Sequence, residues 1–324
     1  MKSKAVLVRK TGGPDALEPD VLEVEAPAAG EVRVRQEAIG VNFIDVYQRR
    51  GLYPLATPFV PGQEAAGVVD AVGEGVTEFK PGDRVGYAGE PGAYTEIRNL
   101  PADRVVRLPE GVDTRTAAGL LLRGMTVEYL IRRTFPVEPG MTVLWHAAAG
   151  GVGLIACQWL AHLGVTVIGT AGGREKAELA RQNGCTHIID YREEDFVARV
   201  RELTGGKGVP VVYDSVGKDT FEGSLACLSR RGYLVTFGNA SGPPPAVDPL
   251  SLAARGSLYM TRPRLGDYTA TRSELTESAE ALLSLVATGV IQAHVGQEWP
   301  LDQAAEAHRA LEGRRTTGST LLIP

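Results

Sequence analysis

The stretch Val143-Leu144-Trp145-His146-Ala147-Ala148-Ala149-Gly150-Gly151-Val152-Gly153 decides the fold of this chain. A short apolar run typical of a buried strand leads into a glycine-rich bend, and the apolar run after the bend predicts a helix. This succession predicts a dinucleotide-binding turn, in which unpaired amides at the helix N-terminus face a pyrophosphate. Gly150 and Gly153 would let the backbone approach the phosphates, whereas Ala148 replaces the first glycine of the usual pattern. A glycine pattern alone is weak evidence, so the interpretation depends on the residues beyond the helix.

Those residues strengthen the prediction. Val165 to Thr170 has the composition of a second buried parallel strand, which completes a βαβ unit. An NAD site usually offers a carboxylate near the end of this strand, but here the chain continues Ala171-Gly172-Gly173-Arg174-Glu175-Lys176. Cations without a strand-end acid suit a 2′-phosphate and favour NADP(H). Glu175 is the one discordant charge, and we expect it to point to solvent.

Strand and helix patterns alternate from Gly124 onwards. A helix is expected at 125–134, followed by strands at 143–146, 165–170, 187–190, 209–214 and 233–237, with helices at 152–163, 174–183, 193–204 and 218–229. Residues 257–261 supply a sixth, edge strand. Such alternation leads to a doubly wound parallel α/β sheet, here a six-stranded dinucleotide-binding domain over residues 124–264.

The flanking regions have a different pattern. Residues 1–123 contain short β-type runs at 4–9, 31–38, 66–72, 84–87 and 93–97, separated by Gly/Pro turns, and predict a compact antiparallel region. The tail, 265–324, is expected to form helices at 273–288 and 301–312 and a strand at 319–323 that returns to the first region. The chain thus predicts two domains, 1–123 with 265–324, and 124–264.

The composition narrows the function classes. The 324 residues include 44% hydrophobic and 23% charged residues, and the net charge of −5 with a pI near 5.7 gives no support for binding nucleic acid or an anionic membrane. Cys157, Cys185 and Cys227 are too scattered for a disulfide framework or a metal cluster, which fits a reducing cytoplasm. The N-terminus lacks a signal-peptide core. The uncharged stretch from Pro139 to Gly173 is interpreted as a buried βαβ core and not as a membrane span.

Several motifs together carry a family resemblance. Gly62-Gln63-Glu64-Ala65-Ala66-Gly67 and Pro81-Gly82-Asp83-Arg84-Val85, followed by 147–153, resemble the medium-chain dehydrogenase/reductase superfamily. Within it, Gly40 to Tyr47, Gly51 to Pro54 and Tyr213 to Gly217 are similar to the zeta-crystallin-like NADPH:quinone oxidoreductases, particularly the bacterial ones. The resemblance covers essentially the whole chain. It implies a GroES-like catalytic domain beside a Rossmann domain.

The departures from the zinc alcohol dehydrogenases concern the metal ligands. Those enzymes place a ligating Cys where this chain has Asn42 and a ligating His where it has Gln63. A carboxamide is a poor zinc ligand beside thiolate and imidazole, so no metal is expected. Without a Lewis acid, alcohol oxidation is disfavoured.

The resemblance implies NADPH-dependent quinone reduction, because quinones delocalise incoming charge and need no metal. Delivery of electrons singly or as hydride stays open. One alternative is an NADPH-dependent enone, alkenal or enoyl-thioester reductase with the same hydride geometry. Another is a nucleotide-binding protein with a structural, sensing or RNA-binding role.

The resemblance also implies the site residues. Asn42, Tyr47 and Tyr53 are the candidates for substrate orientation, hydrogen bonding or proton supply, although Tyr47 could serve only the cofactor and Tyr53 could only pack a turn. Glu64 and His146 are interpreted as hydrogen-bonded structural residues, and Arg314 could instead be a surface ion-pair partner. The residues expected to bind the cofactor are Asn42, Tyr47, Thr126, Tyr129, Gly150, Gly151, Val152, Gly153, Gly172, Gly173, Lys176, Tyr191, Val216, Phe237, Gly238, Asn239, Arg262 and Arg314.

The edge strand predicts an assembly. Leu258-Tyr259-Met260 is apolar, and an exposed apolar edge is a liability that pairing with a symmetry mate removes. We therefore expect a homodimer through this strand, which is also typical of the family.

Overall fold

The computed structural model describes all 324 residues, which divide into two compact units. Unit 1 comprises Met1–Met125, Tyr268–Gly289 and Ala293–Pro324, and unit 2 comprises Thr126–Asp267 and Val290–Gln292. The boundaries expected at 123/124 and 264/265 lie close to these positions. No helix has the length and apolar composition needed to cross a membrane.

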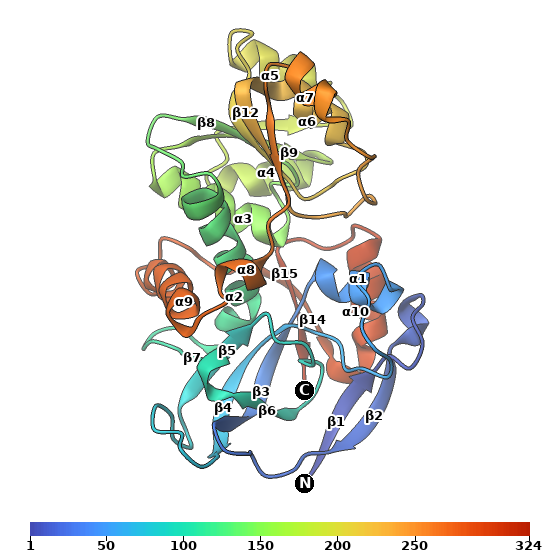
Figure 1. The fold of residues 1–324 in the computed structure, drawn as a ribbon, viewed down its shortest axis with the longest axis vertical. Helices are drawn as coiled ribbons and strands as arrows, with labels where there is room; N and C mark the ends of the chain where they lie inside the picture. The colour runs from blue at the N-terminus through green and yellow to red at the C-terminus, as the bar shows by residue number, and fades with distance from the viewer. The chain divides into compact units, whose positions relative to one another are not determined.

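Unit 2 is built on a six-stranded parallel sheet (Figure 1). Its strand order is β10-β9-β8-β11-β12-β13, the order of a doubly wound dinucleotide-binding fold. The predicted sheet is thus confirmed, including the edge position of the sixth strand. The strands are β8 (Thr142–Trp145), β9 (Thr166–Ala171), β10 (His187–Asp190), β11 (Val209–Asp214), β12 (Leu228–Thr236) and β13 (Tyr259–Thr261).

The helices of unit 2 connect these strands and cover the sheet. The buried side chains of Leu144, Ile168 and Val212 pack with Phe221 and Leu225 in one cluster. Burying one such side chain stabilises the fold by about 1.5–3 kcal/mol. The helices are α3 (Gly151–His162), α4 (Arg174–Gln182), α5 (Phe196–Leu203), α6 (Phe221–Cys227), α7 (Pro249–Ala254) and α8 (Leu265–Tyr268), the last crossing the unit boundary.

Unit 1 is organised around a seven-stranded sheet ordered β14-β15-β3-β4-β5-β7, with β6 also paired to β3. The last strand, β15, lies antiparallel beside β3 although most of the chain separates them (Figure 1). The expected return of the C-terminal strand to the first region is therefore confirmed. The seven strands are β3 (Glu31–Val41), β4 (Glu64–Val72), β5 (Arg84–Ala88), β6 (Ile97–Pro101), β7 (Val106–Arg107), β14 (Val295–Pro300) and β15 (Ser319–Ile323). Strands β1 (Lys2–Leu7) and β2 (Glu18–Glu23) form a separate two-stranded sheet.

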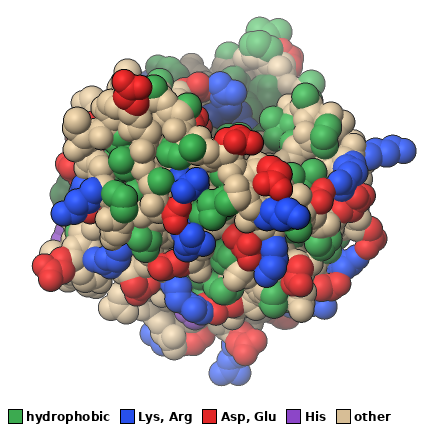
Figure 2. Space-filling view, turned by 90° about the horizontal axis from the view of Figure 1, so that it is seen from below, with side chains coloured by type: hydrophobic (Ala, Val, Ile, Leu, Met, Phe, Trp, Pro, Cys, Tyr) green, Lys and Arg blue, Asp and Glu red, His purple; other side chains and the backbone are tan.

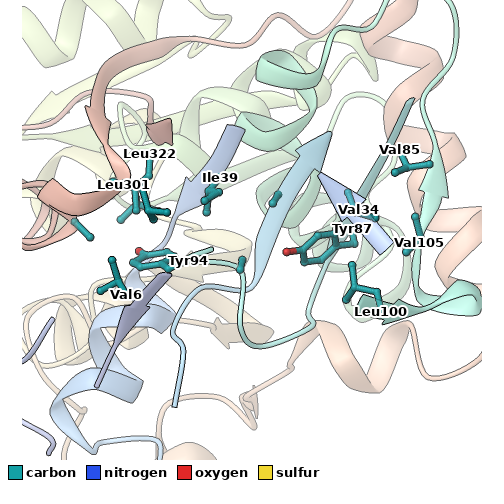
Figure 3. Close-up of a cluster of buried hydrophobic side chains, with 14 of the residues drawn as sticks. Val6, Val34, Ile39, Val85, Tyr87, Tyr94, Leu100, Val105, Leu301 and Leu322 are labelled. Atoms are coloured by element: carbon teal, nitrogen blue, oxygen red, sulfur yellow. The ribbon is translucent and has the colours of Figure 1, made fainter. Parts of the chain in front are cut away.

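The core of unit 1 joins segments from both ends of the chain. Figure 3 shows the ring of Tyr94 among Val6, Ile39, Leu301 and Leu322. Its hydroxyl is hydrogen-bonded to two polar side chains, those of Asp45 and His308. The helices of unit 1 are α1 (Phe43–Arg50), α2 (Thr114–Tyr129), α9 (Arg272–Ala287) and α10 (Ala304–Glu312). Helix α2 continues past the unit boundary into a π-helix (Leu130–Thr134). The core thus fixes the polar end of Tyr94 inside the protein.

Helix α1 was not predicted, although residues 1–123 are mostly strands as expected. Asn42 caps its N-terminus in an extended conformation, and the Asp45 carboxylate accepts the Asn42 amide hydrogen at 2.8 Å. Gly51 ends the helix with φ of +80°, a conformation that glycine adopts without a steric penalty. These capping signals are present in the sequence, but the β-forming residues between them obscured the helix.

Other predictions of the elements were also wrong in detail. The helix expected at 125–134 begins at Thr114, where the Asp113 side chain accepts from the Thr116 amide. The strand expected at 93–97 instead spans Ile97–Pro101. Strand β14 was not predicted, and it pairs in parallel with β15 in the tail, where only a strand at 319–323 was expected.

Candidate active site

The glycine turn connects β8 to α3 as predicted. Gly150 is the N-cap of α3, and a Cβ on Gly153 would overlap the Ala147 carbonyl oxygen and lie 2.6 Å from that of Ala148. Only glycine therefore allows the helix to start this close to the strand end. The amides of the first turn have no acceptor within the helix and carry partial positive charge. The turn fits a pyrophosphate, for which Gly151 and Val152 are the expected donors.

Ala148 occupies the first glycine position without strain. It is fully buried, and its amide donates to the Thr170 carbonyl at 2.9 Å. The preceding residue, Ala147, takes the left-handed conformation with φ of +54°, which is uncommon outside glycine. The left-handed backbone conformation of this turn therefore falls on Ala147 and not on Ala148.

The end of β9 forms the region expected to hold the adenosine phosphate. A Cβ on Gly172 would overlap the Tyr191 hydroxyl, and one on Gly173 would lie 3.2 Å from Arg192 Nη1. Lys176 is half-buried in the first turn of α4, whereas Glu175 is exposed as expected. The structure therefore brings the predicted Gly172, Gly173 and Tyr191 together.

Two residues in this region were missed. The cation of Arg192 lies beside Gly173, and its position next to Tyr191 at the end of a strand was the signal that could have identified it. Asp190, at the end of β10, accepts hydrogen bonds at Oδ1 from the Gly173 amide at 3.0 Å and the Arg192 amide at 3.1 Å. The Asp190 carboxylate stabilises the turn by accepting from backbone amides. The end of β9 thus carries no acid, whereas the end of the neighbouring β10 does.

The ends of β11 and β12 contribute the next group of predicted residues. Val216 follows β11, and its amide donates to Asp214 Oδ1 at 2.8 Å. After β12, Asn239 accepts from Arg262 Nη2 at 3.3 Å in the amide orientation that satisfies both groups. Phe237 packs against Trp145, with ring centroids 5.7 Å apart. These residues lie at the carboxyl ends of parallel strands, where open α/β sheets bind ligands.

Thr126 and Tyr129 lie buried on the last turns of α2. The helix then widens into the π-helix, a rare form that occurs frequently at functional sites. Glu128 was not singled out in the sequence, although its carboxylate is almost fully buried and pairs with Arg133 at 2.6 Å. Arg314 belongs to unit 1, where it follows α10 with φ of +56° and is exposed.

Helix α1 of unit 1 carries the candidates for substrate orientation. The rings of Tyr47 and Tyr53 meet edge to face with centroids 5.3 Å apart, and the Tyr53 amide donates to the Tyr47 carbonyl at 3.3 Å. Tyr47 is 8% exposed, so only a small part of its ring surface is accessible. The structure brings these two tyrosines together as one aromatic pair.

The carboxamide of Asn42 is held by neighbouring acceptors. Its Nδ2 donates to Glu64 Oε2 at 2.8 Å and to the Gly40 carbonyl at 3.4 Å. Both amide hydrogens are therefore used within the protein. The geometry therefore favours a role for Asn42 in capping α1 over a role as a hydrogen-bond donor to substrate.

Glu64 is fully buried and holds three donors. Oε1 accepts from the Leu122 amide at 2.7 Å, and Oε2 lies 3.5 Å from Arg123 Nη1. Burial raises the pKa of Glu64, while the charge of Arg123 and the hydrogen bond from Asn42 oppose the rise. Its expected structural role is consistent with these contacts.

A second buried chain of polar side chains starts at Asp45. Tyr94 donates to Asp45 Oδ2 at 3.0 Å and lies 2.8 Å from His308 Nε2, and His308 Nδ1 is 3.4 Å from Arg49 Nη1. Burial, and then the charge of Arg49, lower the pKa of His308 to about 3. Arg49 in turn pairs with Glu312. The chain ties α1 to α10, and no local pattern in the sequence indicates it.

Whether this site can bind a metal depends on the ligand atoms that its side chains offer. Asn42 and Gln63 are both buried side chains with carboxamide groups, and no group of three His, Cys, Asp or Glu residues in the 324 residues could hold a metal ion. The three cysteines are buried free thiols. The residues present thus do not form the thiolate and imidazole set that zinc prefers.

Comparisons with known proteins agree with this architecture. The protein-family model for the alcohol dehydrogenase GroES-like domain matches residues 28–110. The family model for zinc-binding dehydrogenase matches residues 151–284. The fold and these matches define the class: the chain is a member of the medium-chain dehydrogenase/reductase superfamily.

The relatives narrow the class further. A quinone oxidoreductase of Pseudomonas aeruginosa is 51% identical over 99% of this chain and 100% of its own. The crystal structure of Escherichia coli quinone oxidoreductase complexed with NADPH is 50% identical and has a TM-score of 0.97, with 99% of this chain and 100% of that chain covered. A 2-haloacrylate reductase of Burkholderia is 47% identical over 99% of this chain and 98% of its own. Within the superfamily, the chain belongs to the quinone oxidoreductases.

Proposed function

We propose that this protein is a zinc-independent oxidoreductase that transfers reducing equivalents from NADPH to quinones. The observation that carries the proposal is the likeness over essentially the whole chain to the E. coli quinone oxidoreductase complexed with NADPH. The glycine turn fits a pyrophosphate, and the carboxamides of Asn42 and Gln63 replace the metal ligands of the zinc alcohol dehydrogenases. Together these features favour an acceptor that takes electrons without a Lewis acid.

The chain's own residues bind and orient in this proposal. The bound cofactor supplies the reducing equivalents, and full reduction of a quinone to hydroquinone takes up a hydride and a proton. The first-turn amides of α3 hold the pyrophosphate, while Lys176, Tyr191 and Arg192 surround the 2′-phosphate. The aromatic pair of Tyr47 and Tyr53 orients the acceptor ring, and each hydroxyl is a candidate proton donor.

Turnover with two acceptor classes tests the proposed substrate. We expect NADPH oxidation with 1,4-benzoquinones at a higher kcat/KM than with α,β-unsaturated carbonyl compounds. A metal chelator should leave this rate unchanged. Activity confined to the unsaturated carbonyl compounds, or loss of activity that zinc restores, would contradict the proposal.

The second candidate function is reduction of an electron-poor alkene. The 47% identity with the Burkholderia 2-haloacrylate reductase favours it specifically, because a conjugated acid accepts hydride by the same approach. Turnover of a 2-haloacrylate faster than that of any quinone would establish this reaction instead. NADPH binding without turnover of either class would favour a structural or sensing role.

The choice of NADPH over NADH depends on the cations near β9. Lys176→Ala removes a cation from the first turn of α4, and loss of a charge-assisted phosphate contact costs about 1.5–3 kcal/mol. We expect NADPH affinity to fall by about 10- to 150-fold while NADH affinity stays constant. Arg181→Ala, in the last turn of α4, is the matched control, and an unchanged preference in Lys176→Ala would refute the role of Lys176.

The edge of the six-stranded sheet supports a homodimer. Tyr259 on β13 is 51% exposed and stacks on Tyr233 with centroids 4.5 Å apart. An exposed apolar edge is a template for pairing, and two copies of β13 would satisfy it in a closed, symmetric dimer. Tyr259→Glu would place like charges at that contact, so sedimentation should show a shift from dimer to monomer.

The surface charges bear on a nucleic-acid partner, and the cysteines bear on the cellular compartment. Acidic and basic side chains are interspersed on the face in Figure 2. Ion pairs such as those of Arg33 and Arg35 with Asp70 join opposite charges. This surface does not favour a nucleic-acid partner. The buried free thiols suit a reducing compartment, and we place the protein in the cytoplasm, where fractionation would test the assignment.

A further inference from the structure

Four buried polar side chains link three strand ends of unit 2. His146 follows β8, and its Nδ1 lies 2.9 Å from the Thr170 hydroxyl of β9. Its Nε2 lies 3.0 Å from the Ser224 hydroxyl, which donates to Asp214 Oδ2 at 2.7 Å. All four residues are at most 2% exposed. They form one continuous chain of hydrogen bonds across the sheet.

The acceptor at one end sets the direction of the chain. An ionised carboxylate only accepts, and Asp214 already accepts from the Ser224 hydroxyl. The Ser224 oxygen therefore receives a hydrogen from His146 Nε2, which leaves Nδ1 of a neutral imidazole as an acceptor for the Thr170 hydroxyl. Thr170 Oγ1 in turn accepts from the Ala147 amide at 3.4 Å. The donor and the acceptor of each hydrogen bond are thus assigned, and they fix the tautomer of His146 with its hydrogen on Nε2.

The two ends of this chain hold two different turns. At one end Thr170 contacts the amide of Ala147, and its carbonyl accepts from Ala148; these residues begin the glycine turn. At the other end Asp214 Oδ1 accepts from the amides of Val216 at 2.8 Å and Gly217 at 3.0 Å. Both turns leave the carboxyl ends of neighbouring strands.

We propose that His146, as the Nε2–H tautomer between Thr170 and Ser224, is a positioning residue for the cofactor that aligns the turns at 146–153 and 214–220. It acts through these turns and does not contact the reacting atoms, since its side chain is fully buried. The inference relies on the NADPH binding proposed above. Its test measures binding directly and does not depend on the identity of the acceptor.

The surroundings keep the imidazole neutral. Burial lowers the pKa of His146, and the charge of Asp214 opposes this only in part. The ring of Phe196 packs edge to face on the imidazole, with ring centroids 5.1 Å apart. The two imidazole nitrogens are hydrogen-bonded to the hydroxyls of Thr170 and Ser224. A neutral, fully hydrogen-bonded imidazole suits alignment and not proton transfer.

Isosteric substitutions test the chain without removing the histidine. Thr170→Val and Ser224→Ala each remove one hydroxyl, and NADPH fluorescence titration should show Kd raised about five- to tenfold in each. Thr236→Val is the matched control, because Thr236 lies at the end of β12, is 2% exposed, and its hydroxyl has no partner. Its Kd should stay within about twofold of the wild type. Unchanged NADPH affinity in both Thr170→Val and Ser224→Ala would overturn the proposal, as would equal weakening in the control.

Two readouts separate positioning from general stability. At saturating NADPH, kcat of Thr170→Val should stay within about twofold while KM for NADPH rises, because only cofactor alignment is affected. Nitrogen-15 NMR of the histidines at neutral pH should show one imidazole, lost in His146→Gln, that is the neutral Nε2–H tautomer. A protonated imidazole or an Nδ1–H tautomer at that position would contradict the assignment. If His146→Gln does not fold, disappearance of the hydroxyl contact in Thr170→Val should still shift the same resonance.

Discussion

Asp45→Asn should change how the stability of unit 1 depends on pH. Asp45 is fully buried; Oδ2 accepts from the Asn42 amide and the Tyr94 hydroxyl, but Oδ1 has no partner. Burial raises the pKa of Asp45 from 3.8 to about 7, and the two hydrogen bonds only partly oppose this rise. The charge of Glu64 raises the pKa further, and that of Arg123 lowers it.

The sign is set by proton linkage. The folded carboxyl binds its proton more tightly than the unfolded one, so its contribution to stability is full below about pH 4 and is lost as pH rises through about 7. At about 1.4 kcal/mol per pH unit, the difference between 3.8 and about 7 corresponds to roughly 4 kcal/mol. Asp45→Asn removes this titration. The free energy of unfolding of the variant relative to the wild type should therefore rise by up to roughly 4 kcal/mol from about pH 4.5 to 8.

The assay is urea unfolding at several pH values, with both proteins measured in parallel. Asp70→Asn is the control, because hydrogen bonds from Arg35 and Arg33 outweigh partial burial and lower the pKa of Asp70. Its stabilising contribution is lost only as pH falls below about 4, so its difference from the wild type should be flat from pH 5 to 8. A flat difference for Asp45→Asn, or one that grows towards acid, would refute the reasoning.

Two further substitutions test the packing around the site. Glu64→Gln should destabilise the protein by about 3–5 kcal/mol in urea unfolding, since it leaves Arg123 buried without its partner charge; the double variant Glu64→Leu with Arg123→Met should recover much of the loss. Gly153→Ala should cost about 1–3 kcal/mol from overlap with the Ala147 carbonyl and weaken NADPH binding. Gly266→Ala, where nothing lies within 4 Å of the added Cβ, should melt close to the wild type.

The tertiary structure decided the buried polar networks. Tyr94 and His308 are 214 residues apart in the sequence, and Arg49 and Glu312 are 263 apart. No periodicity or motif links such residues, because their proximity depends on the packing of helices and strands from both ends of the chain. The same reason hid the link from His146 to Ser224. Helix α1 was also missed, since its β-forming residues gave a stronger signal than its caps.

The sequence by itself determined the order of strands and helices in the nucleotide domain and the residues of the glycine turn. These depend on local effects: apolar periodicity, backbone freedom at Gly150 and Gly153, and the chemistry of Asn42 and Gln63 where a metal would need thiolate and imidazole. Only the folded chain showed that both Asn42 amide hydrogens are used internally and that Arg192 lies beside Gly173. The contacts of Asn42 with Glu64 and of Gly173 with Arg192 join different segments of the chain. They form only when packing brings those segments together, to within about 3 Å for a hydrogen bond.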